Sequence, residues 1–185
     1  DQIINEFHHR VGKVLRNGRG VQSSELEEWY VPLSDVESQR WVYTRSQLNV
    51  PEKIRTKTGE VADQIVARLG NPLGKNITTR GLVMGHVQSG KTTNFLSVAA
   101  KALDNEYDLV IVLAGVHNSL RRQTQNRAAR TLVHKPGLWW LGTQLSDFRP
   151  DGNPLEAHLA GDGKRGLLVV KKHSTVLEKL AEWLE

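Results

Sequence analysis

The sequence predicts an α/β fold, in which a parallel sheet with flanking helices follows a mostly helical N-terminal segment. The first observation is a set of short, continuous apolar runs, typical of buried parallel strands, at residues 82–84, 109–113, 138–141 and 166–170. The second is helical periodicity after several of these runs. Strands that alternate with helices in this way are typical of a parallel sheet.

Composition narrows the class of protein. The chain has 185 residues, enough for one domain with a real core, with or without a small appendage. It contains no cysteine, which excludes disulfides, thiolate metal sites and cysteine nucleophiles. No apolar run approaches the length of a membrane span and no signal-peptide pattern opens the chain, so we expect a cytoplasmic protein without a membrane partner. The formal net charge of +5 permits a polyanionic partner without requiring one.

The N-terminal segment, residues 1–75, is expected to precede an α/β core over residues 76–185. An apolar stripe predicts an amphipathic helix over residues 1–17. The S-x-x-E pattern of a capping box predicts a short helix over residues 24–30. This part of the chain is therefore expected to be mostly helical.

The middle of the segment, from Leu33 to Lys57, shows no clear periodicity. Trp41 and Tyr43 are expected to be aromatic anchors that pack on the main domain, with a base-stacking platform as the alternative. A further helix follows and ends at the Gly-Asn-Pro of residues 70–72. Its apolar stripe consists of Val61, Ala62, Ile65, Val66 and Leu69.

A phosphate-binding pattern follows the first apolar run. Residues 85–92 read Gly-His-Val-Gln-Ser-Gly-Lys-Thr and match G-x-x-x-x-G-K-[ST], the P-loop. Its glycines let backbone N–H groups approach an anion closely, and the helix that starts near Lys91 adds the positive end of its dipole. The pattern predicts a nucleotide site for ATP and Mg²⁺, against the alternative of a glycine turn with a solvated lysine.

Lys91 is expected to reach the β- and γ-phosphates, and the Thr92 hydroxyl is expected to hold Mg²⁺, which makes these two the catalytic candidates. The predicted helix continues with apolar residues at helical spacing, Phe95, Val98, Ala99 and Leu103. The residues expected to contact the nucleotide are Gly85, His86, Val87, Gln88, Ser89, Gly90, Lys91, Thr92 and Thr93.

Basic residues follow two of the predicted strands. A helix that begins near Asn118 carries arginines, and two lysines follow the run at residues 166–170. Because the carboxyl ends of parallel strands share the edge where open α/β sheets bind ligands, a nucleic-acid contact is one interpretation of these residues. A solvated helix face is the alternative for the arginines. The candidates are Arg121, Arg122, Arg127, Lys171 and Lys172.

The last part of the chain combines a loop with a final helix. Prolines and glycines over residues 144–165 predict a long loop, with one short helix near residues 155–159. A second capping box, at residues 175–178, predicts a helix whose apolar face comprises Val176, Leu177, Leu180 and Leu184.

An acidic strand end, which ATP hydrolysis requires to hold Mg²⁺ or polarise water, is missing from these runs. Residues 109–113 are followed by Ala-Gly, residues 166–170 by Lys-Lys, and residues 138–141 by Gly-Thr with Asp147 several positions further on. Either the acid lies after Glu185 in a longer protein, or the domain binds nucleotide without cleaving it. The final helix has no following strand, which favours the first alternative.

Two blocks of sequence, residues 80–94 and 111–127, resemble the Z-one domain family. Its members carry the description endonuclease, occur in bacterial restriction and phage-defence systems, and are similar to superfamily-two helicase ATPases. The resemblance runs from about residue 75 to the end and is specific over residues 80–127. It implies a P-loop NTPase fold of the RecA or helicase kind, in which Leu120-Arg-Arg-Gln123 leads a helix along nucleic acid.

The resemblance also implies a function. The chain would be the N-terminal fragment of a DNA-dependent ATPase linked to endonuclease activity, inactive alone, with its acidic strand end in the remainder of the protein. It adds Gln123 to the nucleic-acid candidates and DNA to the expected partners. This chain has Ala114-Gly115 where helicases have Pro-Thr, and no nuclease cluster of carboxylates with lysine is recognisable. The alternatives are a non-hydrolysing ATP-binding module that switches affinity for DNA or a partner domain, and, with least support, a small-molecule kinase.

Overall fold

The computed structural model divides the chain into two compact units, Asp1–Glu106 and Tyr107–Glu185. The helix that follows the P-loop motif belongs to the N-terminal unit. Helices and strands are mixed. The structure describes residues 13–14, 21–22, 29–74, 79–83, 90–148, 161 and 164–184.

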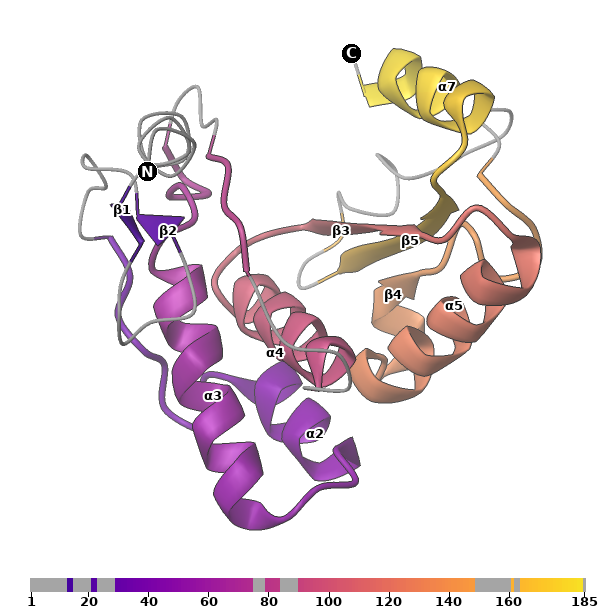
Figure 1. The fold of residues 1–185 in the computed structure, drawn as a ribbon. Helices are drawn as coiled ribbons and strands as arrows, with labels where there is room; N and C mark the ends of the chain where they lie inside the picture. The colour runs from indigo at the N-terminus through magenta and orange to yellow at the C-terminus, as the bar shows by residue number, and fades with distance from the viewer. Residues whose placement is uncertain are drawn as a thin grey trace. The chain divides into compact units, whose positions relative to one another are not determined.

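The described helices of the N-terminal unit are α2 (Gln39–Gln47), α3 (Glu52–Val66) and α4 (Lys91–Asp104). Helix α4 packs against both of the others (Figure 1). Its inner face consists largely of small residues, including Ala99 and Ala100, which let helices approach closely. The helical pattern expected after the P-loop is therefore confirmed.

Trp41 on α2 is the aromatic centre of this unit, with only 4% of its surface exposed. Gly59 on α3 makes room for it, since a Cβ at Gly59 would lie 2.8 Å from the indole Cζ2. The Nζ of Lys101 lies 4.8 Å from the centre of the Trp41 ring, in cation–π contact. Trp41 is thus a packing anchor, as expected, and its burial excludes the base-stacking alternative. Tyr43 is half-buried.

Asp104, the last residue of α4, caps the first turn of α2. Its carboxylate accepts hydrogen bonds from the N–H groups of Arg40, at 3.1 Å, and Trp41, at 2.8 Å. It also forms an ion pair with the Arg40 guanidinium, at 3.3 Å. Burial raises the pKa of Asp104, against the opposing effect of the N–H donors of Trp41 and Arg40. A residue distant in sequence thus caps α2.

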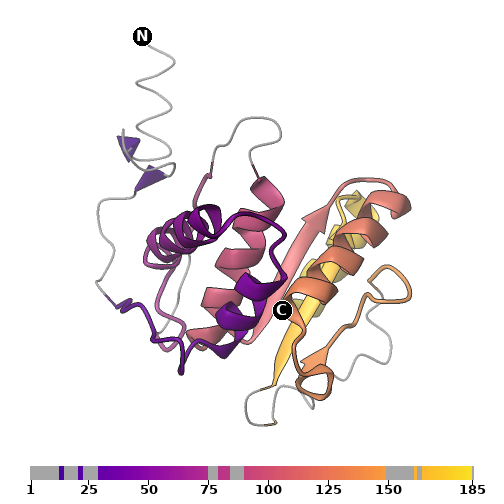
Figure 2. The same cartoon turned by 90° about the horizontal axis from the view of Figure 1, so that it is seen from below.

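The C-terminal unit contains a parallel sheet, with β5 (Arg165–Lys171) between β3 (Leu109–Ala114) and β4 (Trp139–Trp140). Helices α5 (Asn118–Leu132) and α7 (Ser174–Leu184) lie on opposite faces of it (Figure 1). Figure 2 shows α5 running along its face of the sheet. A short 3₁₀ helix, Pro136–Leu138, leads into β4.

Strand β5 is the centre of this unit, because helices cover both of its faces. Leu168 and Val170 pack with Phe148 and with Leu180 of α7. The alternate residues, Leu167 and Val169, are also fully buried. A strand buried on both faces is a continuous apolar run in sequence, which is why residues 166–170 predict it correctly.

The strand predicted at residues 82–84 is wrong over its described part. Leu82 and Val83 are 39% and 46% exposed, and Val83 makes only an isolated bridge. Met84 lies outside the described residues. A buried parallel strand needs a paired neighbour and cover on both faces, and a short apolar run supplies neither by itself.

Two helix predictions for the N-terminal segment are also wrong where residues are described. Lys13–Val14 forms strand β1, antiparallel to β2 at Val21–Gln22, within the helix predicted for residues 1–17. Trp29 and Tyr30 are not helical. Their side chains donate hydrogen bonds to the last turn of α3 and to the segment that follows it. The remainder of both predicted helices lies outside the described residues, as does the one near residues 155–159.

Candidate functional site

Gly90, the first described residue of the P-loop motif, lies at the N-cap of α4. It has φ 75° and ψ 25°, in the left-handed region that an L-residue with a side chain adopts at a cost of about 1–2 kcal/mol. No described atom lies within 4 Å of a Cβ built at this position, so the backbone conformation alone favours glycine. A left-handed residue followed by a helical one turns successive N–H groups to one side, as in an anion-binding nest.

Lys91 is the first residue of α4 and is exposed. A cation at the positive end of a helix dipole is unfavourable by itself and becomes favourable with an anion beside it. In the described part of the chain, no side chain caps the first N–H groups of α4. Thr92 and Thr93 follow in the first turn and are half-buried. The helix start therefore offers N–H groups, a cation and hydroxyls to an anionic ligand.

The rest of the motif, Gly85, His86, Val87, Gln88 and Ser89, lies outside the described residues. Of its three described members, Gly90 has the left-handed backbone, and Lys91 and Thr92 begin α4. The Thr92 hydroxyl is an oxygen ligand of the type that Mg²⁺ accepts. These residues fit a magnesium–triphosphate group on donor chemistry.

A cavity of about 570 Å³ lies beside the first two turns of α4. This volume is within the usual range of small-molecule sites, about 300–1,000 Å³. Helix α4 contributes Gly90, Lys91 and Phe95 among others, and α3 contributes an apolar stripe. The residues Ile54, Thr58, Val61 and Ile65 of this stripe recur at helical spacing. The stripe therefore begins before Val61, the first residue of the stripe predicted from the sequence.

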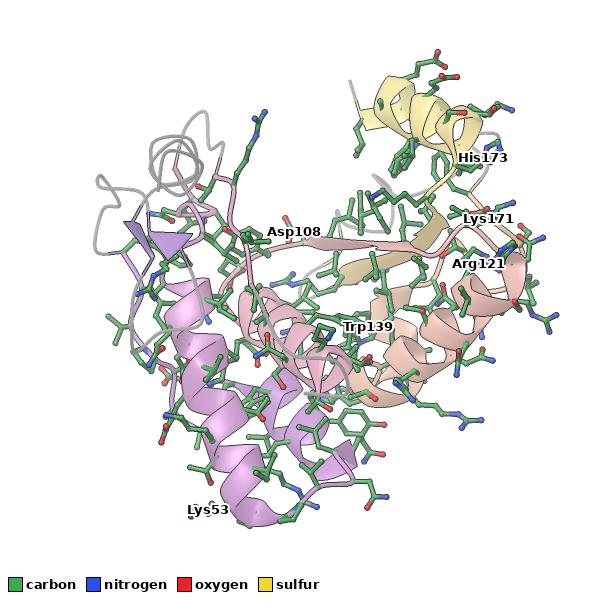
Figure 3. The ribbon with its side chains drawn as sticks, viewed as in Figure 1. Lys53, Asp108, Arg121, Trp139, Lys171 and His173 are labelled. Atoms are coloured by element: carbon green, nitrogen blue, oxygen red, sulfur yellow. The ribbon has the colours of Figure 1, made fainter. Side chains whose placement is uncertain are left out.

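The nucleic-acid candidates lie in the C-terminal unit and differ in exposure. Figure 3 shows Arg121, Lys171 and His173 toward the carboxyl ends of β3 and β5, and Asp108 at the opposite end of β3. Arg122, Gln123 and Arg127 on α5 are exposed, as is Lys172. Lys171 is half-buried and its Nζ lies 3.5 Å from the Asp147 carboxylate.

The prediction that Arg121 contacts nucleic acid is wrong. Only 2% of its surface is exposed, and its guanidinium donates to the carbonyls of Thr143, at 2.7 Å, and Val169, at 3.3 Å. A guanidinium buried in this way is not available to a phosphate at the surface. Arg121 therefore joins α5 to the sheet.

Asp147, the acidic residue nearest to a strand end in the predictions, is committed to neighbouring backbone. Its Oδ1 accepts the N–H groups of Phe148, at 2.9 Å, and Lys171, at 3.3 Å. Across the described residues, no cluster of three or more acidic or histidine side chains is placed to hold a metal. Asp147 thus accepts a hydrogen bond from the backbone at the end of β5.

Comparison with protein-family models, with curated proteins and with solved structures finds no match for this chain. The function must therefore be argued from the residues themselves, and the resemblance to the Z-one domain family stays a prediction. None of the helices in the described ranges is long and apolar enough to cross a membrane.

Proposed function

We propose that this chain has a P-loop NTPase fold and binds ATP–Mg²⁺ through residues 85–93. The observation that carries the proposal is the left-handed Gly90 at the N-cap of α4, inside a G-x-x-x-x-G-K-T sequence. The motif requires a glycine there so that the N–H groups can turn toward phosphate, and the conformation found is one that glycine adopts at least cost. A glycine N-cap, which has no side chain of its own to cap the helix, and Lys91 at the first helical position support the same conclusion.

Each residue of the site has a distinct role in this proposal. Lys91 neutralises the β- and γ-phosphates, and the N–H groups of Thr92 and Thr93 bind phosphate oxygens at the helix start. The Thr92 hydroxyl holds Mg²⁺, which when bound supplies positive charge to the phosphate oxygens.

The wider proposal is that the chain is the nucleotide-binding part of a DNA-dependent ATPase of a restriction or phage-defence system, related to the Z-one domain family. Exposed Arg122 and Arg127 on α5, together with Lys172, are the groups that support DNA binding. If about three charges each neutralise a phosphate, log K should fall with log salt at a slope of about −2 to −3. Removing Arg122 and Arg127 together should flatten that slope by about one to two units, alike for all DNA sequences.

Titration calorimetry with ATP–Mg²⁺ tests the nucleotide site. Lys91→Ala should weaken binding roughly tenfold to a hundredfold, because a hydrogen bond to a charged group contributes about 1.5–3 kcal/mol. Lys53→Ala, which removes an exposed lysine from α3 away from the cavity, is the matched control and should bind as the wild type does. Equal affinity of the wild type and Lys91→Ala would remove the P-loop interpretation.

A second candidate is an ATP-binding module that switches affinity for a partner without turnover. The engagement of Asp147 with Lys171 favours it, because one carboxylate oxygen accepts the Lys171 N–H and the other lies 3.5 Å from the Lys171 ammonium, a cation that would compete with magnesium. Residues 1–185 alone should hydrolyse ATP negligibly. An ATPase assay on a longer protein, with and without DNA, separates the two: turnover that DNA stimulates supports the enzyme, and binding without turnover supports the switch.

A further inference from the structure

The cavity beside α3 and α4 has a lining of two chemical kinds. The first turn of α4 contributes Gly90, Lys91 and Thr93, residues that carry backbone N–H groups, a cation and a hydroxyl. The rest of the lining is mainly apolar, with Val61 and Ile65 from α3 among the contributing residues. A ligand that fits both kinds of lining carries an anionic group joined to a flat or apolar body.

The apolar lining is more than the packing of α3 and α4 requires. Ala62 and Val66 of α3 are completely buried, which is what helix packing explains. By contrast Val61 and Ile65, which line the cavity, are half-buried, and Ile54 is 48% exposed. The cavity therefore keeps apolar surface open to a ligand, next to the proposed phosphate site.

We propose that this cavity takes the nucleoside end of the bound nucleotide. The inference rests on the proposed ATP site, because phosphates at the start of α4 place the remainder of the nucleotide beside the second turn. There Phe95 supplies an aromatic surface, and aromatic side chains bind bases by stacking. Asn94 and Thr58 also line the cavity and offer hydrogen-bond donors and acceptors to the base or the ribose.

The test compares ATP with inorganic tripolyphosphate, both with Mg²⁺, by titration calorimetry. Val61→Trp fills the cavity from α3, and Ile54→Trp does so from a more exposed position where a larger side chain is tolerated. Gln64→Trp, on the exposed side of the same helix and outside the cavity lining, is the matched control. Circular dichroism verifies that each variant keeps its helices.

The wild type should bind ATP about tenfold or more tightly than tripolyphosphate, because stacking and burial of a base contribute on that scale. Both cavity-filling variants should lose about tenfold in ATP affinity and bind tripolyphosphate as before, and Gln64→Trp should change neither. If Val61→Trp does not fold, Ile54→Trp decides the outcome.

Three results would overturn the inference in distinguishable ways. Equal wild-type affinity for ATP and tripolyphosphate, or folded cavity variants that keep full ATP affinity, would exclude the cavity while leaving the P-loop proposal intact. Loss of both ligands in a folded cavity variant would mean that the substitution distorts the phosphate site. Failure of the wild type to bind either ligand would remove the proposed function together with the inference.

Discussion

Gly90→Ala tests whether the start of α4 depends on a left-handed backbone. No described atom lies within 4 Å of the added Cβ, so the described residues contribute no steric clash. The cost is the left-handed conformation of an L-residue, about 1–2 kcal/mol. Restriction of the unfolded chain by alanine offsets about 0.4–1 kcal/mol of it. We expect the free energy of unfolding to fall by about 1 kcal/mol.

Urea denaturation measures this difference, and Gly81→Ala is the matched control. Gly81 also has open space around its Cβ position but lacks the positive φ of Gly90. Alanine at Gly81 should therefore leave the stability unchanged or raise it slightly. The comparison isolates the left-handed conformation, because both substitutions add the same methyl group to a site without crowding.

If the free variant instead relaxes out of the left-handed conformation, its stability is spared and ATP–Mg²⁺ binding must restore that conformation, so the cost of roughly 1–2 kcal/mol appears as about tenfold weaker binding. Gly90→Asn should lose less than Gly90→Ala, since asparagine tolerates the left-handed region better. If Gly90→Ala matched the wild type in both stability and ATP affinity, the left-handed turn would have no role and the nest argument would fail.

Substitutions at Gly59, Asp104 and Arg121 test the packing. Gly59→Ala should lower the melting temperature although alanine favours helices by about 1 kcal/mol, because its Cβ would lie 2.8 Å from a ring atom of Trp41. Asp104→Ala should lower the free energy of unfolding, measured with urea, by about 3 kcal/mol, because the N–H groups at the start of α2 lose their acceptor. Since burial raises the pKa of Asp104 above 3.8, its contribution is greatest below that pH and falls as pH rises through the raised value, so the wild type should lose stability relative to Asp104→Asn as pH rises above about 4. Arg121→Ala should destabilise by about 3 kcal/mol and Arg122→Ala by less than about 0.5 kcal/mol; similar effects would contradict the two environments.

Elements whose sequence pattern is local could be predicted. Residues 109–113 and 166–170 are continuous apolar runs and correspond to β3 and β5 within a residue or so at each end. The helix after the P-loop and the helix that starts at Asn118 are also placed correctly. An apolar run predicts the strand in both cases, but the predicted burial is found only in β5, because β3 is half-buried and Leu113 is 51% exposed.

Elements that depend on distant residues could not be predicted in the same way. Helix α2 has little periodicity of its own and is held by Trp41 against Gly59 and by the cap from Asp104. The same distinction holds for the candidate site. The motif predicts which residues bind phosphate, whereas the cavity exists because α3 and α4 lie side by side. Spacing within one segment contains no information about such contacts.

Arg121 shows why the basic face of α5 misleads. The buried residues of that helix include Arg121, Gln125, Ala128 and Leu132, at helical spacing, so its inner stripe starts with two polar residues. Thr143 explains this, because it accepts the Arg121 guanidinium at its carbonyl and donates from its hydroxyl to Gln125. An interior that is hydrogen-bonded through residues far along the chain looks like a solvated face in sequence.

The segment after β4 completes this network and accounts for Asp147. Strand β4 pairs only with the first residues of β5. Further along β5, side chains instead of a paired strand accept hydrogen bonds from its backbone. The Thr143 hydroxyl accepts the Val169 N–H at 2.7 Å, and Asp147 accepts the Lys171 N–H two residues later. The Val169 N–H is buried and would be costly to leave unpaired, whereas the Lys171 N–H is half-buried, so removing either acceptor should loosen β5 to a different extent. Asp147 is therefore, through one of its oxygens, a backbone acceptor beside β5, and its other oxygen lies 3.5 Å from the Lys171 ammonium.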